Sequence, residues 1–193
     1  MAKRKFLTRS EVDAILKQAQ KSRYAERNYC MILMCYLHGF RVSELCHLSL
    51  SDIDLDSRLI YVRRLKGGLS TTQPLIDIEY NALVSWLNIR KTWRNQDLEW
   101  VFLSQKSGAI SRQQVHTLLK QYGKAANISV VPHPHMLRHA CGYSLADLGR
   151  DTRLIQDYLG HRNISHTVIY TASNSNVFSK SGTLSADNPP ACP

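Results

Sequence analysis

Apolar residues recur at three- to four-residue spacing over most of the chain, a pattern that predicts helices packed on a shared core. The first such stretch follows Thr8, and Glu11 stands three residues later, as a capping box requires. A second stretch, residues 26–37, is so rich in apolar residues that its helix should be central, with Gly39 at its end. A short helix over residues 41–48 is expected next.

The pattern changes between residues 59 and 76. Residues 59–62 and 71–76 predict two short strands, joined by a glycine-containing turn. Helical spacing then returns, and Asp77 and Asp151 are expected to cap two of the later helices. The predicted fold is therefore mainly α with a small antiparallel β-sheet (α+β). Within a helix over residues 135–148, four apolar residues should face the core: Leu137, Cys141, Leu145 and Leu148.

The length and composition describe one domain of ordinary size. The 193 residues, 44% of them hydrophobic and 21% charged, are enough for a real core. We expect a single domain over residues 1–178 and a disordered tail over residues 179–193, which are rich in Ser, Gly, Asn and Pro. No run approaches the roughly 18 apolar residues that span a bilayer, and the N-terminus lacks the apolar stretch of a secretory signal. We therefore expect no membrane association.

The charge balance favours a polyanionic partner. Lys and Arg number 25 against 15 Asp and Glu, so the formal net charge is +10. Such an excess is typical of nucleic-acid binding, although a basic protein without that role stays an alternative. The candidates for DNA contact are Lys3, Arg4, Lys5, Arg9, Arg63 and Arg64.

The cysteines do not predict a metal site or a disulfide framework. They are five in number and include no CxxC pair. A zinc site built from Cys30, Cys35, His38, Cys46 and His47 is conceivable, but its spacing fits no common zinc site. We expect buried thiols, and neither a metal nor a cofactor.

Two arginines and their neighbours suggest phosphoryl transfer without a metal. Each guanidinium is permanently charged and can grip phosphate oxygens bidentately, the task that metal ions perform in other enzymes. Glu44 stands three residues after Arg41, where it can pair with the guanidinium, and His135 stands three residues before Arg138 on the same helical face. An isolated arginine on a helix is usually a solvated surface charge, so neither arginine is decisive alone.

Three segments carry a family resemblance: Gly39-Phe40-Arg41-Val42-Ser43-Glu44-Leu45, His135-Met136-Leu137-Arg138-His139, and the stretch from Leu159-Gly160-His161 to Tyr170, which stands nine residues after His161. In order and spacing they resemble the signature of the tyrosine recombinases, and Lys66 matches the family's lysine in a β-hairpin turn. The resemblance covers residues 8–171. It implies the catalytic-domain fold of that family and the activity of a site-specific DNA recombinase.

The resemblance also implies residue roles. Arg41 and Arg138 would clamp the scissile phosphate, and Tyr170 would attack it to form a 3′-phosphotyrosyl bond. Lys66 would protonate the leaving 5′-oxygen. His135 would act as an acid, a base or a hydrogen-bond donor, and His161 would donate a hydrogen bond to phosphate. The other histidines of this region, His133, His139 and His166, are expected to support packing or backbone contacts, and Tyr143 and Tyr158 to pack in the core.

The short format is especially similar to the fimbrial phase-variation invertases, which flip a promoter-bearing segment between short inverted repeats. Only 40 residues precede Arg41, so the N-terminal clamp domain of most relatives is expected to be absent. The resemblance implies double-stranded DNA with inverted-repeat sites, a homotetramer on DNA, possible DNA-bending accessory proteins and a bacterial cytoplasmic location. The alternatives are a DNA-binding regulator that has lost catalysis and an enzyme like the type IB topoisomerases.

Overall fold

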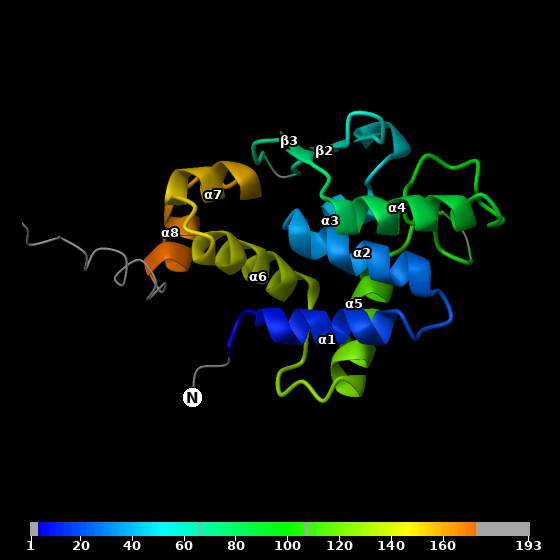
Figure 1. The fold of residues 1–193 in the computed structure, drawn as a ribbon, viewed down its shortest axis with the longest axis horizontal. Helices are drawn as coiled ribbons and strands as arrows, with labels where there is room; N and C mark the ends of the chain where they lie inside the picture. The colour runs from blue at the N-terminus through cyan, green and yellow to red at the C-terminus, as the bar shows by residue number, and fades with distance from the viewer. Residues whose placement is uncertain (1–3, 66, 107, 173–193) are drawn as a thin grey trace, which may run out of the picture.

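The chain folds mainly into helices, as the periodicity predicts, and a small sheet lies at the edge of the helical body (Figure 1). The computed structural model describes residues 4–65, 67–106 and 108–172. The elements in chain order are α1 (Arg9–Ala19), α2 (Ala25–Leu37), α3 (Val42–Cys46), the 3-10 helix η1 (Leu50–Asp52), β1 (Ile53–Asp54), β2 (Leu59–Val62), β3 (Thr71–Pro74), α4 (Asp77–Arg90), α5 (Arg112–Ala125), α6 (Pro134–Asp147), α7 (Thr152–Leu159) and α8 (Ser165–Ala172).

Local signals set most helix starts. The capping box at α1 is present, with the backbone N–H of Thr8 donating to a carboxylate oxygen of Glu11 at 2.8 Å. Asp151 caps α7 as predicted. Asp77 does not cap α4, because the carboxylate of Glu79 reaches back to the N–H of Ile76, which makes residue 76 the N-cap.

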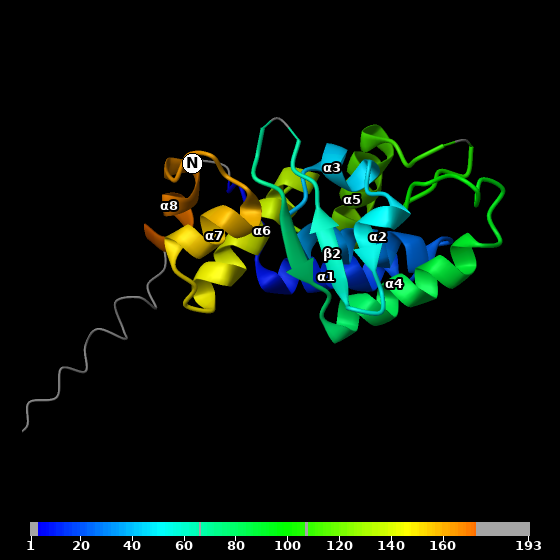
Figure 2. The ribbon, with the colours of Figure 1, turned by 90° about the horizontal axis from the view of Figure 1, so that it is seen from above.

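The sheet is antiparallel in the order β1-β2-β3. Leu59 pairs with Pro74, so β3 ends at a residue that has no N–H for the ladder, two residues before the predicted end. Strand β1 was not predicted, since two residues are too few to show an alternating pattern. Figures 1 and 2 both place β2 and β3 between α7 on one side and α4 on the other.

Helix α6 joins two buried clusters. The larger one lies among α1, α2, α4 and α5 and takes Met136, Leu137 and Ala140 from the first half of α6. The smaller one lies among α6, α7 and α8 and consists of Cys141, Ala146, Ile155, Leu159 and Tyr170. The prediction for Leu148 was wrong, because this residue follows the last turn of α6 and is 66% exposed. Leu137 and Cys141 are buried, and Leu145 is partly buried.

Four of the cysteines lie in the described part of the chain. Cys30, Cys35, Cys46 and Cys141 are buried and carry free thiols, as predicted. His38 contacts Gln73 and Glu79 through its two ring nitrogens. Within the described ranges, no helix is both long and apolar enough to cross a membrane.

Candidate active site

The turn after α2 provides a carbonyl that holds two arginines. Gly39 has φ +57°, and a Cβ there would lie 2.4 Å from the side chain of Leu159, so both the conformation and the close approach favour glycine. The carbonyl oxygen of Gly39 accepts hydrogen bonds from Arg138 Nη1 and Arg64 Nη1. This turn therefore brings the start of α3, the end of β2 and α6 to one place.

Arg41 is fixed by a carboxylate and stays partly exposed. It is the N-cap of α3, and its backbone N–H donates to Glu44 Oε2 at 2.9 Å. Its Nη1 donates to Glu44 Oε1 at 2.7 Å, and 30% of its side chain is exposed. Glu44 thus orients the guanidinium and leaves part of it open to a ligand.

Arg64 is a buried structural residue, which corrects its prediction as a DNA contact. Its guanidinium donates to Glu44 Oε2 at 3.0 Å and to the carbonyl oxygens of His38 and Tyr158, each at 2.8 Å. With no exposed side-chain surface, it cannot reach a DNA backbone. Burial raises the pKa of Glu44, but the N–H of Arg41 and the charge of Arg64 outweigh that effect, so the pKa is lowered.

Arg138 lies inside the site with its orientation set by backbone carbonyls. It is 1% exposed, and its Nη2 donates to the carbonyl oxygen of Leu159 at 2.7 Å, while its Nη1 donates to Gly39. Burial, followed by the charges of Arg64 and Arg41, lowers the pKa of Arg138 to about 10. The guanidinium therefore still carries its charge at neutral pH.

His161 follows the left-handed Gly160 that ends α7. The ring is buried, and its Nδ1 lies 2.9 Å from the hydroxyl of Thr167 on α8. Burial and the charges of Arg138 and Arg41 lower the pKa of His161 to about 3. The ring is therefore neutral at physiological pH and can act as a hydrogen-bonding group but not as a cation.

Tyr170 points into the site from α8. It is 1% exposed, and its hydroxyl lies 3.0 Å from His139 Nδ1. Its ring packs on α6 at Gly142, where an added Cβ would lie 2.6 Å from the ring. Burial raises the pKa of Tyr170 to about 12, so the phenol keeps its proton at neutral pH.

His135 lies one turn before His139 on α6. Its side chain is exposed, and the two imidazole rings meet edge to face with centroids 4.5 Å apart. Partial desolvation of the ring, followed by the charge of Arg138, lowers the pKa of His135. Arg138, His161 and Tyr170 therefore meet around the end of α7, and His135 is linked to Tyr170 through His139.

Lys66 lies outside the described residues, but its neighbours meet the site. The backbone N–H of Leu65 donates to Glu44 Oε1 at 3.2 Å. Gly67 lies so close to Arg162 that an added Cβ would be 2.8 Å from the guanidinium carbon. The turn between β2 and β3 thus reaches both Glu44 and the segment that follows His161.

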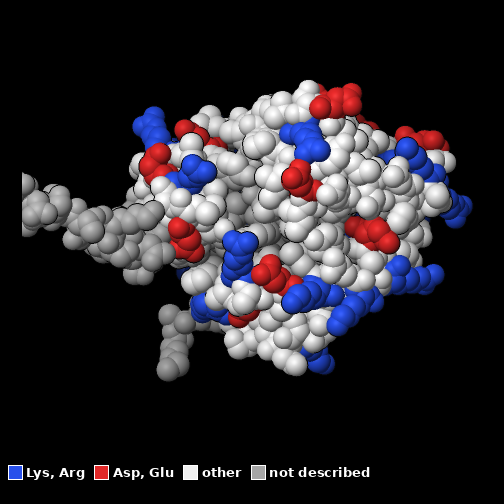
Figure 3. Space-filling model, in the orientation of Figure 1, with Lys and Arg blue, Asp and Glu red and all other residues white. Residues whose placement is uncertain are grey.

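Some of the remaining candidates for DNA contact are held in ion pairs, and others are exposed. Arg4 pairs with Glu11, and Lys5 and Arg9 are exposed. Arg63 pairs with Asp52 at 3.0 Å, with 64% of its side chain exposed. Lys3 lies outside the described residues. On the face shown in Figure 3, basic side chains stand beside acidic ones over much of the surface, and several basic side chains follow one another along its lower right.

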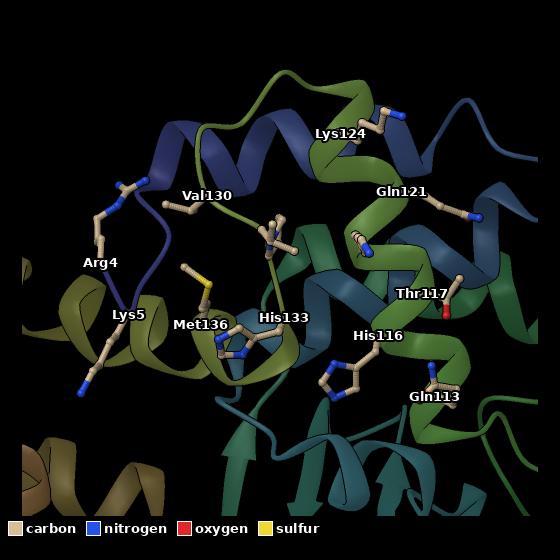
Figure 4. A pocket seen from close by; sticks show the side chains of 13 residues that line it. Arg4, Lys5, Gln113, His116, Thr117, Gln121, Lys124, Val130, His133 and Met136 are labelled. Carbon is tan, nitrogen blue, oxygen red and sulfur yellow. The ribbon is translucent and has the colours of Figure 1, made fainter. Parts of the chain in front are cut away.

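A basic hollow of about 800 Å³ opens beside the first turn of α6 (Figure 4). Polar side chains of α5 line one side, and the N-terminal segment with Arg4 and Lys5 lies opposite. His133 and Met136 lie at its centre, next to His135 in the chain. The lining residues that carry or can carry positive charge are Arg4, Lys5, His116, Lys120, Lys124 and His133.

Comparison with known proteins identifies the family. The model of the phage integrase family matches residues 5–176. The chain belongs to the phage integrase family. The type 1 fimbriae regulatory protein FimB of Escherichia coli (strain K12) is 55% identical over 176 residues, which cover 91% of this chain and 88% of FimB. The predicted resemblance to fimbrial recombinases is confirmed, and the chain is a site-specific DNA recombinase.

Solved structures of this family confirm the predicted fold. The crystal structure of XerA recombinase superposes with a TM-score of 0.79 at 29% identity, over 95% of this chain and 66% of that chain. The XerH recombinase bound to its difH substrate has a TM-score of 0.74 at 22% identity, over 94% of this chain and 54% of that chain. The match to XerH shows the shared fold alone.

Sequence reasoning missed two residues of the site. His139 was expected to support packing, whereas its Nδ1 lies at hydrogen-bonding distance from the Tyr170 hydroxyl. Its position four residues after His135, on the same face of α6, was the available signal. Thr167 holds the His161 ring, and no sequence pattern pointed to it, because the contact depends on how α8 packs on the end of α7.

Proposed function

We propose that this recombinase cleaves and rejoins DNA with Tyr170 as its nucleophile. The observation that carries the proposal is the meeting of three residues at the end of α7. Arg138 donates to the carbonyl of Leu159, and the ring centroids of His161 and Tyr170 lie 6.4 Å apart beside it. The phenol oxygen would form a bond to phosphorus while the bond to the 5′-oxygen breaks. The 3′-phosphotyrosyl product keeps the energy of a phosphodiester, so religation would need no ATP.

The two catalytic arginines would neutralise the phosphate in different ways. Each Nη of Arg138 donates one N–H to a backbone carbonyl and has a second N–H that could donate to a phosphate oxygen. Arg41 is partly exposed and could close on the phosphate from the side of α3. His161 and His135 would add hydrogen bonds, and Lys66 would give a proton to the leaving 5′-oxygen.

We propose that the hollow between α5 and the N-terminal segment receives the DNA backbone. It lies next to the first turn of α6, and its lining includes Lys5, Lys120 and Lys124. The XerH structure, which is bound to difH substrate, supports a DNA partner for this fold. Each neutralised phosphate should contribute about −0.9 to the slope of log affinity against log salt concentration.

We further propose that the reaction inverts a promoter-bearing segment between short inverted repeats and so controls fimbrial expression. The 55% identity to FimB, a type 1 fimbriae regulatory protein, supports this role. The reaction would take place in the bacterial cytoplasm, on a homotetramer and with DNA-bending proteins where the repeats require them.

The first test combines inversion and trapping. The protein is supplied with the genomic DNA that neighbours its gene, and sequencing maps any inversion and the repeats at its ends. A duplex of the mapped repeat, nicked so that the short 5′-hydroxyl fragment is lost, should then trap a covalent adduct in the presence of EDTA. Mass spectrometry should place the DNA remnant on Tyr170, and Tyr170→Phe should bind DNA without forming an adduct.

The outcomes separate the alternatives. A remnant on another tyrosine or on a serine contradicts the assignment of Tyr170. Plasmid relaxation without inversion would indicate a topoisomerase, and DNA binding without any adduct would indicate a regulator. Cleavage that is lost in EDTA and returns with Mg²⁺ would refute a mechanism based on arginines.

A further inference from the structure

We propose that His139 is a catalytic residue of this recombinase and that its Nδ1 accepts the phenolic proton while the Tyr170 oxygen attacks phosphorus. The inference rests on the proposed role of Tyr170 as nucleophile. It assigns the proton acceptor of the first step, which is a separate matter from the groups that hold the phosphate.

The geometry of the pair carries the assignment. His139 Nδ1 lies 3.0 Å from the Tyr170 hydroxyl, within the range expected of a base and the proton that it removes. The two rings cross at 60° with centroids 5.9 Å apart, so the contact is an edge approach and not a stack. Gly142 allows the phenol to lie this close to α6, since any larger residue would meet its ring.

Burial makes a side-chain acceptor necessary. Tyr170 is 1% exposed, so bulk water has almost no access to the phenol where it now lies. The proton must therefore go to a neighbouring group, and the hydroxyl is hydrogen-bonded to His139. His135 lies one turn before His139 on α6 and contacts the His139 ring, which places it to receive the proton afterwards and pass it to solvent.

The surroundings of His139 keep its ring neutral, so that a nitrogen lone pair is free to face the phenol. Burial is the main cause that lowers its pKa to about 4, so the imidazole is neutral at physiological pH. With its one proton on Nε2, the ring offers the lone pair of Nδ1 to the phenol. The charged or titratable groups that face it are His135, Arg138 and His133 of the α6 region, Lys5 of the N-terminal segment and Tyr170 of α8.

Cleavage transfers one proton to His139 and another to the leaving oxygen. The O–H bond of Tyr170 breaks as its oxygen bonds to phosphorus, and the proton moves to His139 Nδ1 to give an imidazolium. The bond from phosphorus to the 5′-oxygen breaks, and that oxygen takes a proton from the general acid. Religation runs in reverse, so the imidazolium returns its proton to the phenol oxygen.

The test compares single-turnover cleavage rates on the nicked duplex of the mapped repeat. His139→Asn places an amide oxygen near the position of Nδ1, so it can still accept a hydrogen bond but cannot take the proton. His139→Gln is a second variant, in case the first one folds poorly, and circular dichroism checks both. His47→Asn is the matched control, because His47 is an exposed histidine at the end of α3, outside the proposed site.

The expected loss for His139→Asn at pH 7 is about 10²–10⁴-fold in cleavage rate, with unchanged DNA affinity. Hydroxide can replace a missing base, so the variant should recover by about tenfold per pH unit relative to the wild type as the pH rises. His47→Asn should cleave like the wild type.

Three results would overturn the proposal. A variant rate equal to that of the wild type would make His139 a packing residue. A faster rate would make it a restraint on Tyr170. A slower rate whose ratio to the wild type does not change with pH would leave it only a positioning role. Failure of the proposed nucleophile is recognised separately, because Tyr170→Phe would then still form the adduct.

Discussion

Replacing Glu44 by glutamine tests whether one buried carboxylate supports both the fold and the site. Its carboxylate is fully buried and accepts four hydrogen bonds: from the N–H and Nη1 of Arg41, from Arg64 Nη1 and from the N–H of Leu65. Glu44→Gln keeps an acceptor oxygen but removes the charge. Arg64, which has no exposed side-chain surface, then lacks its counter-charge.

The expected cost follows from that burial. Breaking a buried ion pair by removing one partner costs about 3–5 kcal/mol, because the remaining charge stays buried without compensation. Because Arg64 keeps its hydrogen bonds to backbone carbonyls, we expect the loss to be near the lower value, about 3 kcal/mol. This is a large part of the roughly 5–15 kcal/mol that stabilises a domain. The pKa of Glu44 is lowered in the fold, so its contribution is present above the ordinary pKa of glutamate and is lost as the pH falls through the lowered value.

Urea denaturation followed by circular dichroism measures the loss. The matched control is Asp77→Asn, which breaks the exposed ion pair of Asp77 with Arg58 at 2.6 Å and should cost about 0–1 kcal/mol. The reasoning is refuted if Glu44→Gln loses less than about 1 kcal/mol or no more than the control. A normal stability with reduced cleavage would show that Glu44 orients Arg41 without stabilising the fold.

Three further predictions concern α6, α7 and pH. Gly142→Ala should destabilise the protein by about 1–3 kcal/mol in urea denaturation, because its Cβ would lie 2.6 Å from the Tyr170 ring. At a helical position with free space, the same substitution would stabilise the protein by up to about 1 kcal/mol. Stability should fall as the pH drops below about 6.5, since folding holds His161 and His139 neutral with pKa values of about 3 and 4; urea midpoints that do not change between pH 7 and pH 5 would contradict this. Asp151→Ala should cost about 1 kcal/mol in the same assay through loss of the α7 cap, and no change would make the cap redundant.

Local signals account for the part of the fold that could be predicted. The capping box at Thr8 and the left-handed Gly160 depend on residues within a few positions of one another, so the sequence shows them directly. The prediction failed at Leu148, because the spacing of apolar residues does not show where a helix extends past the elements that it packs on. It also missed β1, which depends on its register with β2 and on no pattern of its own.

In the candidate site too, some residues could be predicted from the sequence and others depend on tertiary packing. The positions of Arg41, Arg138 and Tyr170 in the sequence match a family signature and could be named in advance. The role of Arg64 could not, because its acceptor on Tyr158 lies 94 residues away and only the packing of α7 on β3 brings them together. For the same reason His139 was first interpreted as a packing residue, since α8 supplies its partner 31 residues later.

The orientation of Arg138 links the chemistry to the backbone of two distant segments. Its two Nη atoms donate to Gly39 at the end of α2 and to Leu159 at the end of α7. The C-terminal ends of helices leave carbonyls unpaired and carry partial negative charge, so a buried guanidinium satisfies these carbonyls and is oriented by them in return. Gly39 also packs directly against the side chain of Leu159, because glycine has no Cβ to hold them apart. The same close contact that packs α7 onto the turn after α2 therefore fixes the direction in which the remaining N–H groups of Arg138 can meet a phosphate.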